Sequence, residues 1–244
     1  MRSRIPVGVS VGIEPTLPAQ LARIEAYLAD GYRRVKLKIK PGWDLQVIQA
    51  VRQRWPDLLL QVDANSAYTL EDIPVLRQLD QYNLLLIEQP FGPEDMLDHA
   101  RLQRQVRTPI CLDESITSYD HARWALELGA CRVINIKVPR VGGLTAARKI
   151  HDLCLAQGIP VWGGGMLETN IGRALNLAAA AQAGYTLPGD ISASARYFSE
   201  DIATPDFVLH EDSTITVPDG VGLGVKVNQK RVKKVCSRTE TFTI

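Results

Sequence analysis

The sequence lacks the features typical of secreted, membrane-spanning and nucleic-acid-binding proteins. Its four cysteines, Cys111, Cys131, Cys154 and Cys236, lie far apart with no CxxC pair, which favours buried thiols in a cytoplasmic protein over a disulfide framework. No run of about 18 apolar residues occurs, so no membrane-spanning helix is expected. The 28 Lys and Arg residues nearly balance the 27 Asp and Glu residues, which argues against a nucleic-acid or polybasic membrane partner.

The sequence does contain a repeat of short apolar segments and longer amphipathic ones. The strand-like segments cover residues 7–11, 35–39, 59–63, 84–88, 110–113, 133–137 and 159–162, with a weaker eighth near 189–191. Most are apolar almost throughout, which is typical of strands buried on both faces of a sheet. Helix patterns lie between them, as where Thr16 precedes an apolar helix face and Gly31 follows it.

Eight strands that alternate with helices predict an α/β fold of the TIM-type (β/α)8 barrel. The alternative, an open doubly wound sheet, is disfavoured because no Gly-rich phosphate loop follows the first strand. We assign residues 1–205 to the barrel. Residues 206–244 form a second region, with a predicted strand, turn and strand at 214–217, 218–220 and 225–227. The basic, polar tail that follows from Asn228 is expected to be loosely ordered.

Five charged residues interrupt or end the apolar strands at a regular spacing. Lys38, Asp63, Glu88, Asp113 and Lys137 follow one another at intervals of 25, 25, 25 and 24 residues. One barrel repeat therefore separates each residue from the next. All five should lie at the carboxyl ends of strands two to six, on the face where barrel active sites are built.

The three carboxylates of this set predict a metal site. Asp63, Glu88 and Asp113 come from adjacent strands, and three carboxylates close together repel one another strongly when no cation neutralises them. An all-oxygen site suits Mg²⁺, which keeps positions open for water and substrate. The alternative is that each carboxylate caps a helix or pairs with a local lysine, and three carboxylates in register make this less favoured.

The two lysines of the set predict proton transfer next to a carboxylate. Lys38 and Lys137 lie on strands four positions apart, hence on opposite sides of an eight-stranded barrel, and Lys36 points the same way as Lys38. A metal ion and a neighbouring ammonium group should lower a lysine pKa enough for it to act as a base. Asn65 and Asn135 are candidates for supporting roles beside the ligands and lysines, with ordinary hydrogen bonding as the alternative.

A glycine run follows the seventh predicted strand. Residues 163–165 are all glycine, and Met166 comes next. Glycines allow the backbone to approach a ligand closely, so Gly165 and Met166 are candidate substrate-binding residues.

Taken together, these residues resemble the enolase superfamily in its muconate-lactonizing subgroup. The resemblance is carried by the KxK motif at 36–38, three metal-ligand motifs at 63–65, 87–90 and 112–115, and the second lysine motif at 135–137. The segments at 38–44 and 164–169 are similar to those of o-succinylbenzoate synthases and N-succinylamino acid racemases. The match covers about residues 5–224, which is the barrel part of that family.

The resemblance implies an enzyme that acts on a small-molecule carboxylate. It implies Mg²⁺, with Mn²⁺ as a substitute, on Asp63, Glu88 and Asp113. In o-succinylbenzoate synthesis, a syn-dehydration of menaquinone biosynthesis, Lys38 would be the base and Lys137 would stabilise the enolate by a cation–π contact. In racemisation, the two lysines would be bases on opposite faces of the substrate. A dipeptide epimerase is a further possibility within the subgroup.

The chain also departs from the pattern that this resemblance implies. Members begin with an α+β capping domain that closes the barrel mouth, whereas this sequence begins at the first predicted strand, so we expect a barrel without that domain. Residues 206–244 are the part that would normally join the cap. Asn170 stands where the family often has glycine. The alternative function is therefore a catalytically impaired barrel kept as a scaffold or assembly subunit. An exposed apolar rim and a homo-oligomer are expected.

Overall fold

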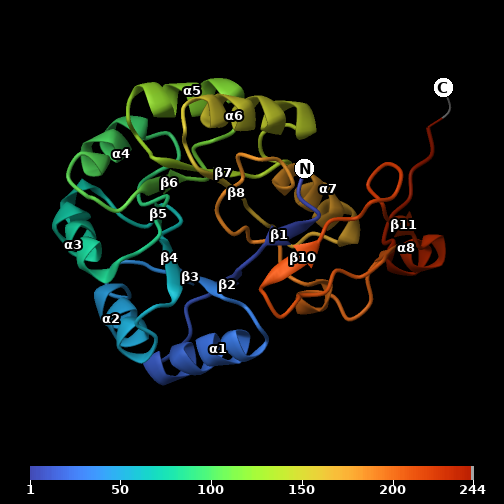
Figure 1. Cartoon of the computed structure of the whole chain (residues 1–244), viewed down its shortest axis with the longest axis horizontal. Helices are drawn as coiled ribbons and strands as arrows, with labels where there is room; N and C mark the ends of the chain where they lie inside the picture. The colour runs from blue at the N-terminus through green and yellow to red at the C-terminus, as the bar shows by residue number, and fades with distance from the viewer. Residues whose placement is uncertain (243–244) are drawn as a thin grey trace.

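The centre of the molecule is a curled parallel sheet. In the computed structural model, which describes residues 1–242, seven strands form this sheet in the order in which they occur along the chain (Figure 1). They are β2 (Val9–Val11), β3 (Arg34–Lys38), β4 (Leu59–Asp63), β5 (Ile87–Glu88), β6 (Ile110–Leu112), β7 (Val133–Ile136) and β8 (Val161–Gly163). Because neighbouring strands are parallel, their carboxyl ends meet at one edge of the sheet. The predicted alternation of strands and helices is confirmed for these seven strands.

Helices cover the outer face of this sheet (Figure 1). They are α1 (Leu17–Ala29), α2 (Leu45–Arg54), α3 (Ile73–Gln78), α4 (Met96–Gln103), α5 (Tyr119–Glu127), α6 (Leu144–Ala156) and α7 (Asn170–Ala180), with short 3-10 turns η1 (Leu70–Asp72), η2 (Leu79–Tyr82) and η3 (Ser194–Arg196). Capping residues fix where these helices begin. The Thr16 hydroxyl accepts a hydrogen bond from the Ala19 amide at 3.3 Å, and the Ser118 hydroxyl accepts one from the His121 amide at 3.1 Å.

No regular eighth strand forms near 189–191, where Gly189 makes only an isolated parallel bridge with Val7, so the full eight-stranded barrel is not confirmed. In its place an irregular segment hydrogen-bonds to both ends of the sheet: the Gly8 amide donates to Gly189 at 2.8 Å, and the Asp190 amide donates to Gly163 at 2.9 Å. Pro188 has no amide hydrogen for a ladder, and glycine weakens a strand. These two residues explain why the segment crosses the gap without regular pairing.

The two strands predicted in the carboxyl-terminal region form, each with a distant partner. The two strands there, β10 (Thr214–Thr216) and β11 (Lys226–Val227), do not form a hairpin. β10 pairs with β1 (Arg4–Pro6), and β11 pairs with β9 (Ala203–Thr204), both antiparallel.

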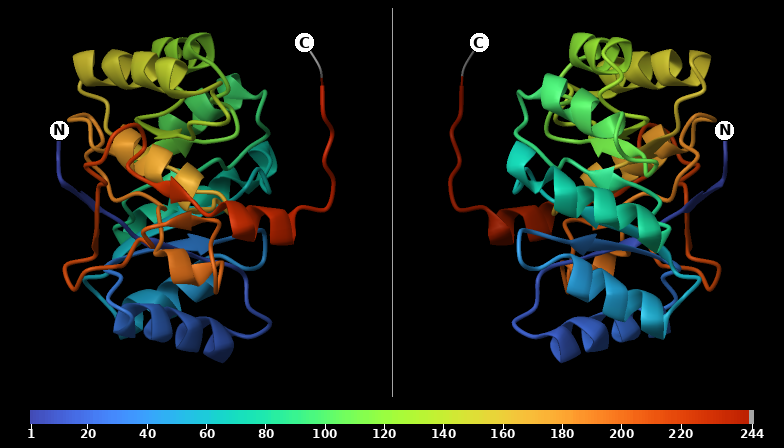
Figure 2. Two further views of the ribbon diagram at one scale, coloured as in Figure 1. Left: turned by 90° about the vertical axis from the view of Figure 1, so that its right-hand side faces the viewer. Right: turned by 90° about the vertical axis from the view of Figure 1, so that its left-hand side faces the viewer.

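The polar tail is also more ordered than predicted. Residues Gln229–Val235 form the helix α8, capped by the Asn228 side chain. It projects from the body of the molecule in Figure 2.

The predicted second region shares the core of the first. Phe207 and Ile215 lie in the same apolar core as the sheet. The division at residue 205 stays a prediction.

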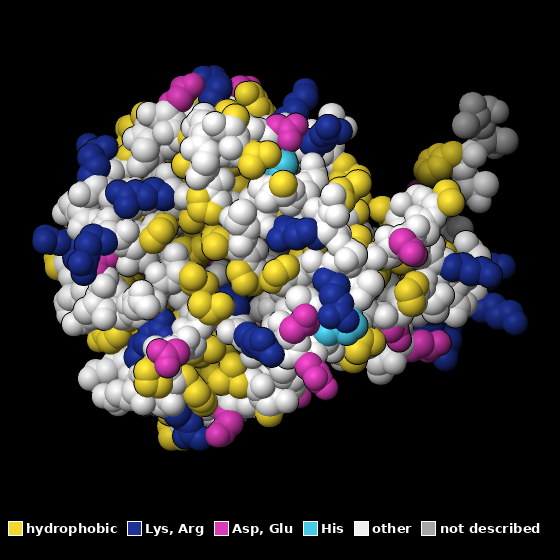
Figure 3. Space-filling model, in the orientation of Figure 1, with side chains coloured by type: hydrophobic (Ala, Val, Ile, Leu, Met, Phe, Trp, Pro, Cys, Tyr) yellow, Lys and Arg dark blue, Asp and Glu magenta, His cyan; other side chains and the backbone are white. Residues whose placement is uncertain are grey.

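The core and surface agree with most of the composition analysis. Cys111, Cys131 and Cys154 are buried as expected, but Cys236 is exposed. Among residues 1–242 no helix has both the length and the apolar character needed to cross a membrane. On the face shown in Figure 3, apolar side chains lie over the middle, and lysine and arginine side chains lie around the edge and at several places nearer the centre.

Candidate active site

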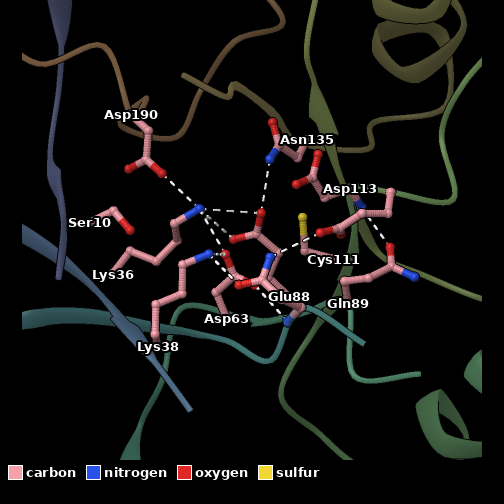
Figure 4. A network of polar contacts seen from close by, with 12 residues as sticks. Ser10, Lys36, Lys38, Asp63, Glu88, Gln89, Cys111, Asp113, Asn135 and Asp190 are labelled. Carbon is pink, nitrogen blue, oxygen red and sulfur yellow. Dashed lines mark hydrogen bonds and ion pairs between the residues drawn. The ribbon is translucent and has the colours of Figure 1, made fainter. Parts of the chain in front are cut away.

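The structure brings the five regularly spaced charged residues to one edge of the sheet. Asp63 at the end of β4 is the register partner of Lys38 on β3 and of Glu88 on β5. Asp113 directly follows β6, and Lys137 directly follows β7. The three carboxylate residues are at most 1% exposed. Figure 4 shows Lys36 and Lys38 pointing at Asp63 and Glu88 from one side, with Asp113 on the other.

Lys36 lies at the centre of this group. Its Nζ is 3.1 Å from Asp63 Oδ2, 3.0 Å from Glu88 Oε2 and 2.7 Å from Asp190 Oδ2 (Figure 4). Burial alone lowers the pKa of Lys36, but Asp190, Glu88 and Asp63 outweigh it and hold that pKa well above its usual value. Lys36 therefore stays charged inside the sheet. It also lies 5.0 Å from the centre of the Trp162 ring.

Each of the two candidate bases is paired with a different carboxylate. Lys38 Nζ is 2.6 Å from Asp63 Oδ2, and Lys137 Nζ is 2.7 Å from Asp113 Oδ2. Lys38 also donates to the Asn65 side chain, whose amide nitrogen donates to Glu114 Oε1 at 2.9 Å. The side chains of Lys38 and Lys137 are 29% and 12% exposed. Both lysines can therefore reach solvent or a ligand, while their partner carboxylates are buried.

Glu88 is the most enclosed of the acidic groups. Its Oε1 accepts a hydrogen bond from Asn135 Nδ2 at 2.9 Å. Its Oε2 accepts no hydrogen bond from the described residues, 1–242, although Lys36 Nζ lies 3.0 Å away. Burial raises the pKa of Glu88 to about 8, since the lowering effect of Lys36 only partly offsets burial and the neighbouring carboxylates. The side-chain oxygen of Asn135 also accepts no hydrogen bond from residues 1–242. Two buried oxygen atoms at this centre therefore have no hydrogen-bond donor within the described part of the chain.

The donor set fits a divalent cation, although the side chains are not arranged around one. Within residues 1–242, no three Asp, Glu, His or Cys side chains form a ready metal-binding group. Asp63 and Asp113 instead form ion pairs with lysine and arginine side chains, which neutralise their charge. The position of the carboxylates on three neighbouring strands, their burial and Glu88 Oε2, which accepts no hydrogen bond from residues 1–242, agree with the oxygen ligands that Mg²⁺ prefers. The metal ligands stay a prediction.

The glycine run is explained by close packing beside the lysines. A Cβ atom on Gly164 would lie 2.3 Å from Asn135 Oδ1 and 2.7 Å from Lys137 Cγ. A Cβ atom on Gly165 would lie 2.1 Å from the carbonyl oxygen of Asp190. Met166 is 53% exposed. Gly165 and Met166 both line a cavity of about 330 Å³ together with the lysines. Their role in substrate binding stays a prediction.

Several residues of the site were missed or underrated by sequence reasoning. Asp190 forms ion pairs with both Lys36 and Arg34. Arg34 Nη1 is 2.7 Å from Asp190 Oδ1. Arg140 pairs with Asp113, and the Gln89 side chain accepts from the Asp113 amide at 3.0 Å. Asp190 breaks the 25-residue spacing, so the pattern gave no signal for it. Gln89 directly follows Glu88, and Arg140 comes three residues after Lys137, so closeness to a predicted site residue was the signal that the sequence offered for them.

The comparisons with known proteins decide the family. Residues 19–231 match the family described as enolase C-terminal domain-like. The chain belongs to the enolase superfamily. It is 52% identical to an o-succinylbenzoate synthase of Geobacillus kaustophilus over 99% of this chain and 64% of that protein. It is 55% identical to an N-succinylamino acid racemase of Amycolatopsis sp. over 92% of this chain and 61% of that protein.

The solved structures agree with this membership of the enolase superfamily. A superfamily member from Listeria innocua is 49% identical with a TM-score of 0.92, over 96% of this chain and 63% of that one. The sequence thus spans somewhat less than two thirds of the length of the relatives that it matches. The resemblance inferred from the motifs is confirmed at the level of the superfamily and of these two kinds of relative.

Proposed function

We propose that this chain catalyses removal of a proton next to a carboxylate, as an o-succinylbenzoate synthase, an N-succinylamino acid racemase or both. The observation that carries the proposal is the pairing of two lysines with two buried carboxylates from opposite parts of one sheet edge: Lys38 with Asp63, and Lys137 with Asp113. Proteins of both names are about half identical to this chain. The dehydration and the racemisation need the same first step, so one site geometry serves both.

The residues of the chain have distinct roles in this proposal. Lys38 accepts the proton next to the substrate carboxylate, and Lys137, four strands along the sheet, faces the substrate from the other side. In racemisation Lys137 returns a proton to the opposite face, and in dehydration its charge stabilises the negative charge that develops. Lys36 lies beside Lys38 and contacts the same oxygen, Asp63 Oδ2, at 3.1 Å, so it helps to hold that carboxylate in place.

The remaining site residues hold the ligands and the substrate in place. Asp63, Glu88 and Asp113 would hold Mg²⁺, for which Mn²⁺ is a substitute, and Asn135 orients Glu88 through its 2.9 Å hydrogen bond. A divalent cation on these ligands supplies charge stabilisation at the substrate carboxylate. Asn65 fixes Lys38 by accepting its hydrogen bond. Gly165 and Met166 line the cavity where the substrate would bind.

The experiment that tests this function follows product formation by the purified chain. One arm measures o-succinylbenzoate formation from its cyclohexadiene precursor, and the other measures racemisation of an N-succinylamino acid, each with Mg²⁺ and with EDTA. Lys137→Ala is compared with the control Lys149→Ala, because Lys149 is exposed on the outside of α6.

The expected result is turnover in at least one arm that EDTA and Lys137→Ala abolish and that Lys149→Ala leaves unchanged. Absence of turnover in both arms with Mg²⁺ would refute the proposal for this chain. It would favour the alternative of a barrel retained as a scaffold.

A further inference from the structure

One arginine in the wall of the candidate active site differs from the other basic residues there. Lys36, Lys38, Lys137 and Arg140 line the cavity, and each forms an ion pair with a buried carboxylate. Arg196 lines the same cavity of about 330 Å³. Among residues 1–242, no carboxylate lies within ion-pair distance of its guanidinium group, whereas the other four cations are already neutralised by the chain. Arg196 therefore brings an uncompensated positive charge to the cavity.

The structure holds this guanidinium group in one place. Arg196 ends the turn η3, and its Nη2 donates a hydrogen bond to the backbone carbonyl of Ser10 at β2. Its guanidinium carbon lies 5.2 Å from the ring centre of Tyr27 and 5.1 Å from that of Tyr197. Stacking on two aromatic rings restricts the side chain without using its N–H donors. An ordered arginine loses little further entropy when it binds a ligand.

Most of the hydrogen-bonding capacity of Arg196 is unused. A guanidinium group has five N–H donors in a planar fork, and one hydrogen bond, to Ser10, is formed by the Arg196 side chain among residues 1–242. This fork matches the two oxygens of a carboxylate. Figure 4 shows Ser10 beside Lys36, on the side away from Asp113. Arg196, which is bonded to Ser10, thus approaches the cavity from the side away from Asp113 and its partner Lys137.

We infer that Arg196 binds a second carboxylate of the substrate, at a distance from the carboxylate next to the reacting carbon. This inference rests on the proposed function, which takes the substrate class from two relatives. The names of both, o-succinylbenzoate synthase and N-succinylamino acid racemase, contain a succinyl group. That group ends in a carboxylate which takes no part in either reaction. In the proposed reaction Lys38 and Lys137 lie beside the reacting carbon of the substrate. Arg196, which has no ion-pair partner among residues 1–242, is then free to bind the carboxylate at the far end of the succinyl group. Arg196 is then a specificity-determining residue that selects dianionic substrates.

The test compares two ligands that differ only at this end. One is an N-succinylamino acid. The other is its N-succinamoyl analogue, in which a neutral amide of the same shape replaces the terminal carboxylate. Calorimetry with Mg²⁺ present measures the dissociation constant of each ligand for the full chain and for Arg196→Met, Arg196→Lys and the control Arg77→Met. Arg77 is exposed on α3, outside the cavity.

The unmodified chain should bind the succinyl ligand more tightly than the succinamoyl ligand by about 10- to 100-fold, the range expected for hydrogen bonds to a charged group. Arg196→Met should remove this preference and change binding of the neutral analogue by less than about threefold. Arg196→Lys should retain part of the preference through its charge, and Arg77→Met should retain all of it. A purely structural role for Arg196 predicts equal weakening of both ligands, and this result, or no preference in the unmodified chain, would overturn the inference.

The same samples separate this inference from the proposed function. Racemisation and dehydration are measured in parallel with binding. A ligand preference that depends on Arg196 in a chain without turnover would support the subsite and refute the proposed reaction. Turnover without such a preference would do the reverse.

Discussion

The buried ion pair between Arg34 and Asp190 should make a large contribution to stability. Arg34 is 1% exposed; its Nη1 lies 2.7 Å from Asp190 Oδ1, and its Nη2 donates to the carbonyl oxygens of Pro188 at 3.0 Å and Gly189 at 2.6 Å. Arg34→Met would remove these contacts together. Asp190 keeps Lys36, and Gly189 keeps the Gly8 amide, but the Pro188 carbonyl loses its hydrogen bond from Arg34.

The magnitude follows from burial. Removing one partner of a buried charge pair costs about 3–5 kcal/mol when the other charge is left unpaired. Because Asp190 keeps Lys36, we expect the lower end, about 3 kcal/mol, which for a chain of this size corresponds to a fall of roughly 6–12 °C in Tm. Arg54 offers a matched control, because it lies at the same 2.7 Å from Glu25, but both side chains are about half exposed. Arg54→Met should cost less than about 1 kcal/mol. Urea and thermal unfolding measure both variants against the unmodified chain.

The pH dependence gives a second check on the same pair. Burial by itself raises the pKa of Asp190, but Lys36 and Arg34 outweigh burial and hold that pKa below its ordinary value. A depressed pKa contributes stability above the unfolded value near 3.9, and this contribution is lost as pH falls below about 4. The difference between Arg34→Met and the unmodified chain should thus be constant from about pH 5 to 8 and shrink below about pH 4. A cost for Arg34→Met no larger than that for Arg54→Met would refute the reasoning.

Three further predictions concern the glycine run, the metal and its supporting amide. Gly165→Ala should lower the free energy of unfolding by about 1–3 kcal/mol, because its Cβ would collide with the Asp190 carbonyl. In the same urea titration Gly92→Ala, which has open space at its Cβ, should change it by less than about 0.5 kcal/mol. Asn135→Ala should weaken Mg²⁺ binding by about 10- to 100-fold in calorimetry, since Asn135 donates to Glu88; unchanged affinity would exclude Glu88 as a ligand oriented by Asn135. EDTA should abolish turnover, and either Mg²⁺ or Mn²⁺ should restore it; turnover that persists in EDTA would contradict a metal site.

The sequence predicted those parts of the molecule that follow a period. Seven strands and the shared edge of Lys38, Glu88 and Lys137 came from hydrophobic runs and regular spacing. At the eighth position Gly189 forms an isolated bridge with Val7, and Pro188, which has no amide hydrogen, does not extend it into a regular strand.

In the carboxyl-terminal region the strands predicted at 214–217 and 225–227 form, at 214–216 and 226–227, but the sequence did not show their partners. In the structure each strand finds a distant partner, at 4–6 and 203–204 respectively. The lysine-rich composition of Gln229–Val235 suggested a loose tail, although the cap at Asn228 supports a short helix. Local composition does not report such tertiary pairings.

The ion pairs within the site were also beyond sequence reasoning. The period placed Asp63 next to Lys38, but it did not show that Lys36 reaches Asp190 across the gap in the sheet. Arg196 lies far from the motif residues in sequence and enters the cavity only because η3 returns to β2. These contacts depend on which strands and turns lie next to one another in the folded chain. The spacing of residues along the sequence does not give that information.

The proposed reaction requires Lys38 and Lys137 to remove the substrate proton from opposite faces. Deuterium exchange at the α-carbon of each enantiomer of an N-succinylamino acid, followed by NMR in D₂O with Mg²⁺, measures this directly. The unmodified chain should exchange the α-proton of both enantiomers. Lys38→Ala should retain exchange with one enantiomer and Lys137→Ala with the other, since each variant keeps one base. Exchange of both enantiomers by both variants, or of neither by the unmodified chain, would contradict the account.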